Sequence, residues 1–350
     1  MPSVESKKSK GKGKAVPAEA KATASLPLGK QLAHTDKAVR DQAVRNLEAF
    51  LSRGSGEAGG AYEPLSDSEM AKLWKGLFYC FWMSDKPLVQ QALATDLANL
   101  LLRIDPGTGR AARIEASLGF LDGFWTALVR EWGGIDRLRI DKYYMLIRRY
   151  VNATFRLLAR EEWDSDAVER VNTIIGGASG PMSWQDKSVP SSLASHLADV
   201  YLEELDKVLA EGDVAPAPVV DLVYPHIVLL ARTRTQAVHT RLMTVVFTPL
   251  ITALSPRVVE VVERPAKRLR GPVPVPAPVV ADDEDDEDAL FAAIARTAAV
   301  EGKQATKAQA KTALLQAMFK EAAQEGAVES NRRKIYTVVR EQGDDDEDDE

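Results

Sequence analysis

Residues 73–87 read LWKGLFYCFWMSDKP, and this short stretch holds two tryptophans, two phenylalanines, a tyrosine and the chain's only cysteine. On a helix that starts after Ser66 and runs to about Met83, its apolar side chains form an arc wider than half the circumference. Such a helix must be buried on more than one side. Catalysis at Cys80 would require a base or a cation to lower its pKa, and no histidine is near in the sequence. The stretch therefore predicts a core helix and not a catalytic pocket.

Helix-length amphipathic stretches extend outward on both sides of this core helix. Ser66 and Glu69 have the spacing of a capping box, and Pro87 suits the first turn of the helix that Ser84 and Asp85 begin. Pro225 is expected to kink or interrupt its helix, and no convincing strand is found between about Leu26 and Leu254. The expected helices follow Thr35 to about residue 51 and then span about 66–83, 84–104, 111–132, 139–162, 166–175, 190–211, 218–232 and 235–254.

Short connections between these stretches favour antiparallel helix pairs. Stacked pairs of roughly 40 residues are typical of repeat proteins, although the sequence has no strict repeat. The predicted fold class is therefore all-α, either a HEAT-like α-solenoid or an irregular antiparallel helical array, with disordered tails and an acidic linker.

Composition divides the chain of 350 residues into five segments. They are a disordered lysine-rich tail (1–25), an α-helical repeat-like domain (26–255), a proline-rich, basic and acidic linker (256–288), C-terminal helices (289–340) and an acidic tail (341–350). The acidic runs at 282–288 and 344–350 hold fourteen acids, and without them the formal net charge changes from −6 to +8. The acidic pI therefore does not argue against a polyanionic partner.

Several classes of protein are disfavoured by the residues that the chain lacks. One cysteine allows no intramolecular disulfide framework, and four scattered histidines have no metal-ligand spacing. No apolar run of signal-peptide type is present, and none approaches the roughly 18–20 residues of a membrane span. The sequence therefore predicts a soluble intracellular protein with no metal, no cofactor, no membrane partner and no small-molecule substrate.

No enzyme motif is convincing either. GSGEAGG at residues 54–60 matches the glycine spacing of a dinucleotide-binding loop, but that site needs a strand before the loop and a helix opening from it. A helix precedes this loop, so a flexible linker is the better interpretation. A hydrolytic or nucleotide-dependent activity would rest on this loop and Cys80 alone, and no catalytic residue is assigned.

The strongest polar feature is residues 137–160, which read RLRIDKYYMLIRRYVNATFRLLAR. At 100° per residue, Lys142, Arg149, Arg156 and Arg160 fall within about 40° of one another, opposite an apolar face. A cationic stripe of this kind is typical of a nucleic-acid neighbour, and the alternative is a solvated face paired with acids such as Glu161 and Glu162. The candidate residues for binding RNA or a partner are Arg137, Arg139, Lys142, Arg148, Arg149, Arg156 and Arg160.

Two further charged features lie in the linker and the tail. RPAKRLR at 264–270 resembles a short nuclear-import signal, with Lys267, Arg268 and Arg270 as its candidate residues, or is an ordinary charged linker. The acidic runs keep flexible segments soluble or engage basic proteins, including ribosomal proteins or histones. Composition does not choose between these alternatives.

Three blocks of this sequence resemble the Nop52 family of nucleolar ribosomal RNA processing proteins. They are AVRDQAVRNLEAFL at 38–51, LWKGLFYCFWMSDKPLVQQALATDLANLL at 73–101 and FLDGFWTALVREWGGIDRLRIDKYYMLIRRYVNATFRLL at 120–158. The resemblance covers roughly residues 30–255, and ALLQAMFKEA at 313–322 and NRRKIY at 331–336 look like the shorter, fungal-type members.

This resemblance implies a non-enzymatic factor of the nucleolus and nucleus. It would be a helical scaffold in precursors of the large ribosomal subunit that supports pre-rRNA processing, with pre-rRNA of the large subunit and other large-subunit assembly factors as partners. No catalytic residue of the family is carried over. The alternative function is a nuclear protein-binding adaptor or histone chaperone that uses the acidic runs.

Overall fold

The structure is a computed structural model that describes residues 27–56, 61–212, 214–255, 258–259, 279–280 and 289–343. The predicted tail at 1–25, both acidic runs and the import-signal residues Lys267, Arg268 and Arg270 lie outside the described residues. The predictions made for those segments are therefore not tested by the fold.

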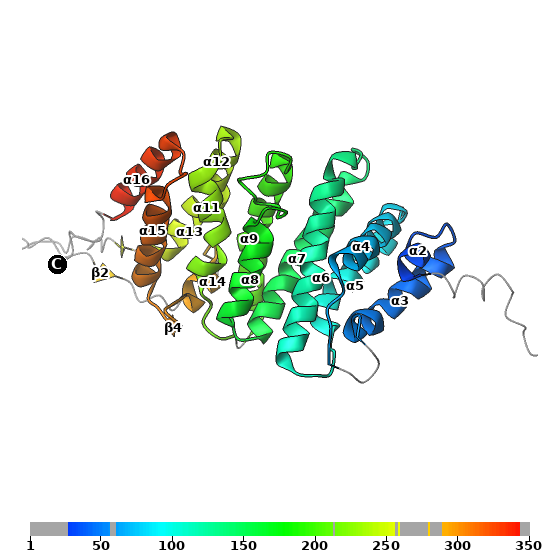
Figure 1. Ribbon diagram of the computed structural model, residues 1–350. Helices are drawn as coiled ribbons and strands as arrows, with labels where there is room; N and C mark the ends of the chain where they lie inside the picture. The colour runs from blue at the N-terminus through cyan, green and yellow to red at the C-terminus, as the bar shows by residue number, and fades with distance from the viewer. Residues whose placement is uncertain are drawn as a thin grey trace, which may run out of the picture.

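Helices dominate the described part of the chain (Figure 1). In the first half they are α2 (Leu28–Leu32), α3 (Lys37–Arg53), α4 (Asp67–Trp82), α5 (Pro87–Arg103), α6 (Arg110–Glu131), the 3-10 helix η1 (Trp132–Gly134), α7 (Ile140–Arg160) and α8 (Ser165–Gly176). In the second half they are α9 (Ser191–Ala210), α10 (Val219–Leu222), α11 (Tyr224–Arg232), α12 (Gln236–Leu242), the π-helix η2 (Met243–Phe247), α13 (Thr248–Leu254), α14 (Ala292–Thr297), α15 (Lys307–Ala323) and α16 (Glu329–Gly343).

Alternate helices along the chain pack against one another, which produces two layers. In one layer α2, α4, α6, α8 and α11 follow one another, and in the other layer α5 packs on α7, α7 on α9 and α9 on α12. Figure 1 shows the helices in one row, from α2 and α3 at one end to α15 and α16 at the other. The predicted all-α helical array is confirmed, while its assignment to the HEAT type and its division into domains stay predictions.

Local sequence signals set most helix boundaries. The hydroxyl of Ser66 accepts the N–H of Glu69 at 3.3 Å, and the Glu69 carboxylate accepts the N–H of Ser66 at 3.0 Å, so the capping box is present. α5 begins at Pro87 and not at Ser84. Pro225 interrupts its helix as expected, because α10 ends and α11 begins on either side of Val223.

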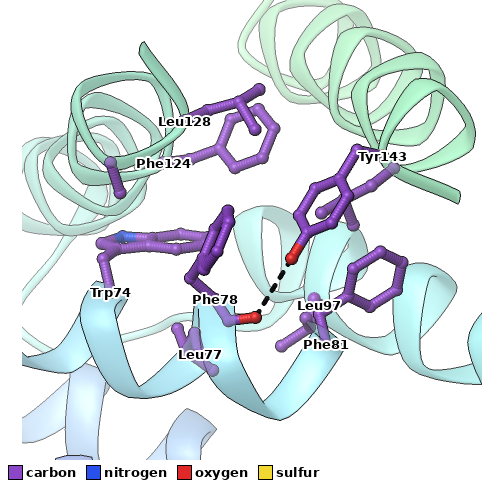
Figure 2. Close-up of a pocket in the computed structure, with 10 residues that line it drawn as sticks. Trp74, Leu77, Phe78, Phe81, Leu97, Phe124, Leu128 and Tyr143 are labelled. Carbon is purple, nitrogen blue, oxygen red and sulfur yellow. Dashed lines mark hydrogen bonds between the residues drawn. The ribbon is translucent and has the colours of Figure 1, made fainter. Parts of the chain in front are cut away.

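The aromatic stretch of α4 is the centre of the core. Trp74 is 3% exposed, its ring stacks on Phe120 with centroids 4.7 Å apart, and its indole N–H donates to the Phe120 carbonyl at 3.1 Å. Figure 2 shows the Tyr143 hydroxyl from α7 reaching down to the backbone carbonyl of Phe78, at 3.2 Å. These side chains leave a cavity of only about 10 Å³, about the space of one water-sized probe. The stretch is therefore core, as the sequence predicts.

Two glycines let the helices approach this closely. A Cβ atom on Gly123 of α6 would lie 2.4 Å from Cδ1 of Trp74, and one on Gly76 of α4 would lie 2.5 Å from the carbonyl oxygen of Gly29. Neither position has space for a side chain. The indole of Trp74 therefore packs directly over the backbone of α6, and α2 crosses α4 in backbone contact.

The C-terminal helices pack on the end of the array, where α15 contacts α11 and α13. The amide of Asn331 donates to the carbonyls of Leu230 and Thr233 at 3.1 and 2.8 Å, at the C-terminus of α11. The buried carboxylate of Glu321 accepts Arg232 at 2.7 Å. Residues 289–343 therefore continue the helical array in this structure.

No strand lies among the described residues of 27–255, as expected, and the two short strand pairs come later in the chain. The antiparallel pairs are β1 (Val258–Val259) with β2 (Val279–Val280) and β3 (Ala299–Val300) with β4 (Lys303–Gln304). Ala217 donates its N–H to Thr297 and accepts the N–H of Ala299, both at 2.8 Å, so this second hairpin is anchored to the chain before α10. Strands of two residues are too short to show an alternation of apolar and polar residues, so the sequence does not predict them.

One helix, Gln236–Leu254, is long and apolar enough to cross a membrane by length and composition, with a mean hydropathy of 1.4. This helix is not an unbroken apolar run, because His239, Arg241 and four threonines interrupt it. Val246 and Leu250 are fully buried in the array, whereas Thr240 and Thr244 face solvent. The π-turn in this helix precedes Pro249, whose missing N–H cannot bond the preceding turn. Packing of one face in the core accounts for the apolarity of this helix.

We expect Trp74→Ala to lower the free energy of unfolding by about 3–5 kcal/mol, because it removes a buried aromatic ring from a filled core. Tyr79→Ala is the matched control, since Tyr79 lies on the same helix but is 41% exposed. Chemical denaturation of the purified chain measures both changes. Equal losses for the two variants would contradict the central position of Trp74.

Burial lowers the pKa of His226 to about 3, and neither ring nitrogen has a hydrogen-bond partner within the described residues. The unfolded imidazole takes up a proton below about pH 6.5, so stability is full above that pH and falls as the pH decreases towards the folded value, by up to about 1.4 kcal/mol per pH unit. We expect His226→Phe to flatten this fall between pH 6.5 and 5 in melting experiments. Parallel pH profiles for the two proteins would show that His226 does not contribute.

Candidate nucleic-acid interface

Lys142 does not lie on an exposed face of α7, so its place in the predicted cationic stripe is wrong. It is 6% exposed, and its ammonium donates to the carbonyls of Phe81, Trp82 and Ser84 at 2.9, 2.7 and 2.8 Å. Burial lowers the pKa of Lys142 to about 8, so the group is still charged at neutral pH. Its three N–H donors cap the C-terminus of α4, where helical carbonyls have no intrahelical partner.

Arg160 also has a structural role. One guanidinium nitrogen donates to the carbonyl of Leu102 at 2.7 Å, near the C-terminus of α5, and another pairs with Glu161 at 2.9 Å. Glu161 has a side chain only 2% exposed and also accepts Arg110 and Arg113. Although burial alone would raise the pKa of Glu161, hydrogen bonds from Arg110 and Arg160 lower it overall. For Arg160, the structure therefore supports the alternative interpretation, in which the cations of α7 pair with acids such as Glu161.

Arg148 faces acids on α9, and Arg156 faces Glu211, which directly follows α9. Arg148 donates to Glu203 at 2.7 Å and to Glu204 at 2.8 Å, whereas Arg156 lies 3.9 Å from the carboxylate of Glu211. Glu204 has a side chain 6% exposed, so its pair with Arg148 is shielded from solvent. These two arginines belong to contacts between α7 and α9 as much as to any outer surface.

Arg137, Arg139 and Arg149 are the remaining predicted cations. Arg137 is exposed, and neither Arg137 nor Arg149 has an ion pair within the described residues. Arg149 is half-buried, and its Nε has no hydrogen-bond partner in this part of the chain. Arg139 pairs with Asp136 and lies over the Trp82 ring at 4.8 Å. The structure therefore brings Arg139 next to an aromatic side chain of α4.

The solvent face of α4 adds residues that reasoning from α7 alone missed. Lys72, Lys75 and Tyr79 are exposed and Trp82 is partly exposed, and their spacing places them on one helix face over about 15 Å. A helical wheel of α4 places these four residues on one face, but the buried aromatic residues of the same helix make this exposed face hard to recognise. We call the set that it forms with the start of α7 the α4 surface, and its residues are Lys72, Lys75, Tyr79, Trp82, Arg137 and Arg139.

Cations and aromatic rings lie together on the α4 surface, and Leu138 beside them is 92% exposed. Such a surface offers rings and guanidinium planes on which unpaired bases stack, with ammonium groups that meet phosphates. Within the set only Arg139 forms an ion pair among the described residues. The α4 surface therefore has the chemistry of a single-stranded RNA contact.

The two sequence features that hinted at catalysis have structural roles. Cys80 is 4% exposed, and burial raises the pKa of its thiol to about 11, so it is not an activated nucleophile. Gly54 ends α3 in the left-handed region, with φ of 66°, so a helix and not a strand precedes GSGEAGG. Within the residues that the structure describes, no group of three or more histidine, cysteine, aspartate or glutamate side chains is placed to hold a metal ion.

We expect Lys142→Ala to destabilise the fold by at least about 1.5–3 kcal/mol, because it leaves buried carbonyls without a charged donor. The control is Lys75→Ala on the neighbouring exposed face, which changes stability by less than about 0.5 kcal/mol. Denaturant melts measure both values. Similar small effects for the two lysines would show that Lys142 does not cap α4.

Comparison with known proteins places the chain among nucleolar proteins. The family described as "Nucleolar protein,Nop52" matches residues 23–339. Ribosomal RNA processing protein 1 homolog A of Mus musculus is 32% identical over 226 residues, which are 65% of this chain and 43% of that protein. Ribosomal RNA processing protein 1 homolog B of Homo sapiens is 36% identical over 186 residues, 53% of this chain and 23% of that protein.

A third relative, Ribosomal RNA processing protein 1 homolog of Drosophila melanogaster, is 34% identical over 203 residues, 58% of this chain and 27% of that protein. The chain thus spans less than half the length of these curated relatives. The family match covers most of the chain and includes the core helix α4 and the basic helix α7. It confirms the predicted family and the predicted nucleolar and nuclear location: the chain belongs to the Nop52 family of nucleolar proteins.

Proposed function

We propose that this protein is a non-enzymatic ribosome-assembly factor that supports pre-rRNA processing in nucleolar precursors of the large ribosomal subunit. The relatives are named ribosomal RNA processing proteins, which supports a role in maturing ribosomal RNA. A helical array with a filled aromatic core and a buried, unactivated cysteine supports a scaffold in place of catalysis.

The observation that carries this proposal is the α4 surface. Tyr79 is 41% exposed, although it lies on the helix whose other aromatics form the core. The Arg139 guanidinium lies over Trp82 at 4.8 Å, which orders two groups able to stack on bases. Tyr79 and Trp82 each contact the core ring of Phe78, but the exposed parts of their rings share a helix face with Lys72 and Lys75. This combination is best explained by a ligand with rings and negative charges.

The contact with pre-rRNA is thereby moved from the middle of α7 to its start and to α4. Arg137 and Arg139 remain in the proposed RNA-contacting set, which otherwise consists of the α4 residues of the α4 surface. Arg149 is left out of this set, because it is half-buried in the middle of α7. Lys142 is excluded because three carbonyls occupy its ammonium. Arg148, Arg156 and Arg160 are assigned to contacts within the array or with protein partners, because acids or carbonyls already face them.

The two-layer array suits the scaffold part of the proposal. In repeat arrays each helix pair contacts mainly its neighbours, so the surface grows with the number of pairs and several partners can bind along it. Other large-subunit assembly factors are the proposed protein partners. Folding of residues 289–343 onto the end of the array extends this surface beyond α13.

The test is ultraviolet crosslinking of the tagged chain in cells, with sequencing of the attached RNA and identification of co-purifying proteins. We expect crosslinks clustered in large-subunit pre-rRNA, together with assembly factors. A triple variant, Lys75→Ala, Tyr79→Ala and Arg137→Ala, should lower the crosslink yield about tenfold, because base stacking on one aromatic side chain contributes about 1–3 kcal/mol. Arg241→Ala is the control, since Arg241 is an exposed cation already paired with Asp199 at 2.6 Å.

The melting temperature of each purified variant shows whether a loss of crosslinks reflects unfolding. Unchanged crosslinking of the triple variant would contradict the α4 surface as the RNA contact. Assembly factors without crosslinked RNA would make that surface a protein interface. Histones without assembly factors would favour the adaptor or chaperone function, and deletion of residues 282–288 and 344–350 should then abolish capture of those histones.

A further inference from the structure

A second surface of opposite charge lies on the other side of α6 from α4, between α8 and the α10–α11 segment. It is an open groove of about 890 Å³, within the size range of ligand sites on proteins. Its apolar lining includes Trp163, Val168, Pro218 and Pro225. Ala299 and Gly302 of the β3–β4 hairpin also line the groove. Elements far apart in the sequence therefore build one continuous groove.

The charged side chains that line this groove are all acidic: Glu162, Glu169 and Asp221. None of the three forms an ion pair within the described part of the chain, and desolvation in the groove raises the pKa of Asp221. Arg110 interacts electrostatically with Glu162, but Arg110 is already paired with Glu161 and Asp164. The groove is thus a surface of uncompensated negative charge.

One side-chain amide in the groove has an acceptor that is unpaired in the part of the chain that the structure describes. Asn172 donates its amide N–H to the backbone carbonyl of Asp221 at 2.8 Å, which leaves its side-chain oxygen as the free end of the amide. That oxygen is buried and has no partner among the described residues. A ligand that satisfies Asn172 and Asp221 must therefore bring hydrogen-bond donors.

The turn between α7 and α8 sets the shape of the groove at a conformational cost. Glu162 and Trp163 are consecutive non-glycine residues in the left-handed region, with φ of 53° and 56°, and each such residue costs on the order of 1–3 kcal/mol. The indole N–H of Trp163 donates to the carbonyl of Ala215 at 2.8 Å. This turn places an aromatic wall beside Pro218 and leaves Glu162 exposed at the rim.

The backbone along the groove excludes recognition by strand addition. Pro216 and Pro218 have no N–H, and Ala217 between them already bonds to Thr297 and Ala299. A ligand must therefore be recognised by its side chains. Long side chains with an aliphatic stem and a cationic head fit best, because the stem packs on Trp163 and Pro218 while the head meets the acids.

We propose that the α8–α10 groove binds an extended, lysine- and arginine-bearing segment of a protein partner. The acidic rim disfavours RNA by charge repulsion, so the groove and the α4 surface select opposite classes of ligand. This inference does not depend on RNA binding at the α4 surface and stands or falls by its own test.

The test uses the full chain and a twelve-residue peptide of alternating lysine and alanine that carries a fluorophore and a photoreactive benzophenone. We expect saturable binding by fluorescence anisotropy and crosslinks to groove residues such as Val168 and Pro218. The double variant Glu169→Gln and Asp221→Asn should weaken binding about tenfold or more, because it removes two of the three carboxylates that line the groove. Asp141→Asn, at an exposed acid on α7, is the matched control and should bind like the unaltered chain.

The acidic runs of the same chain are the competing sites for such a peptide, and the crosslinks distinguish them. Crosslinks confined to residues 282–288 and 344–350, or equal affinity of the double variant, would overturn the proposal. Absence of saturable binding would overturn it as well, as would crosslinking of a single-stranded RNA oligonucleotide to the groove. Far-ultraviolet circular dichroism melts of each variant verify that the fold is retained, and Glu162→Gln provides a second, milder variant at the exposed rim.

Discussion

The carbonyl groups at the C-termini of the helices are the constraint on which this array depends. In a stacked array these carbonyls are covered by the next helix pair, and each one left without a donor costs on the order of 1–3 kcal/mol. Side chains from later helices supply the donors: Lys142 reaches the end of α4, Arg160 the end of α5 and Asn331 the end of α11. Two of these donors are cations, which also interact favourably with the negative end of a helix dipole. These capping contacts thus fix the position of one helix pair relative to the next pair in the array.

This constraint explains why the basic helix was only partly interpreted from its sequence. A helical wheel gives the angle of Lys142 on α7, but not which element lies opposite that angle, and here it is the end of α4. Signals that act within a few residues were predicted correctly, because their partners are close in the chain: Ser66 caps with Glu69, and Pro225 separates α10 from α11. The family match shows where the chain belongs, but it does not say which cations are free.

The same division between local and distant causes applies to the elements that were missed. The hairpin at Ala299 exists because Ala217, some eighty residues earlier, accepts and donates backbone hydrogen bonds there. The groove could not be predicted from the sequence either. Glu162, Glu169 and Asp221 look like ordinary surface acids in the sequence, and only the packing of α8 near α10 brings them together. Tyr79 shows the reverse case. A helical wheel of α4 places Tyr79 on the exposed face, but the six aromatic and leucine side chains around it in 73–82 indicate burial.

The α4 surface and the groove carry opposite charge without cancelling each other, because the array separates them. α4 and α8 lie in the same layer with α6 between them, so two interhelical spacings of 8–10 Å place their axes about 16–20 Å apart. That is about twice the Debye length of roughly 8 Å at physiological ionic strength. Each surface is therefore screened from the other, and a single rigid array can present cations and aromatic rings to RNA at one position and carboxylates to a basic protein segment at another.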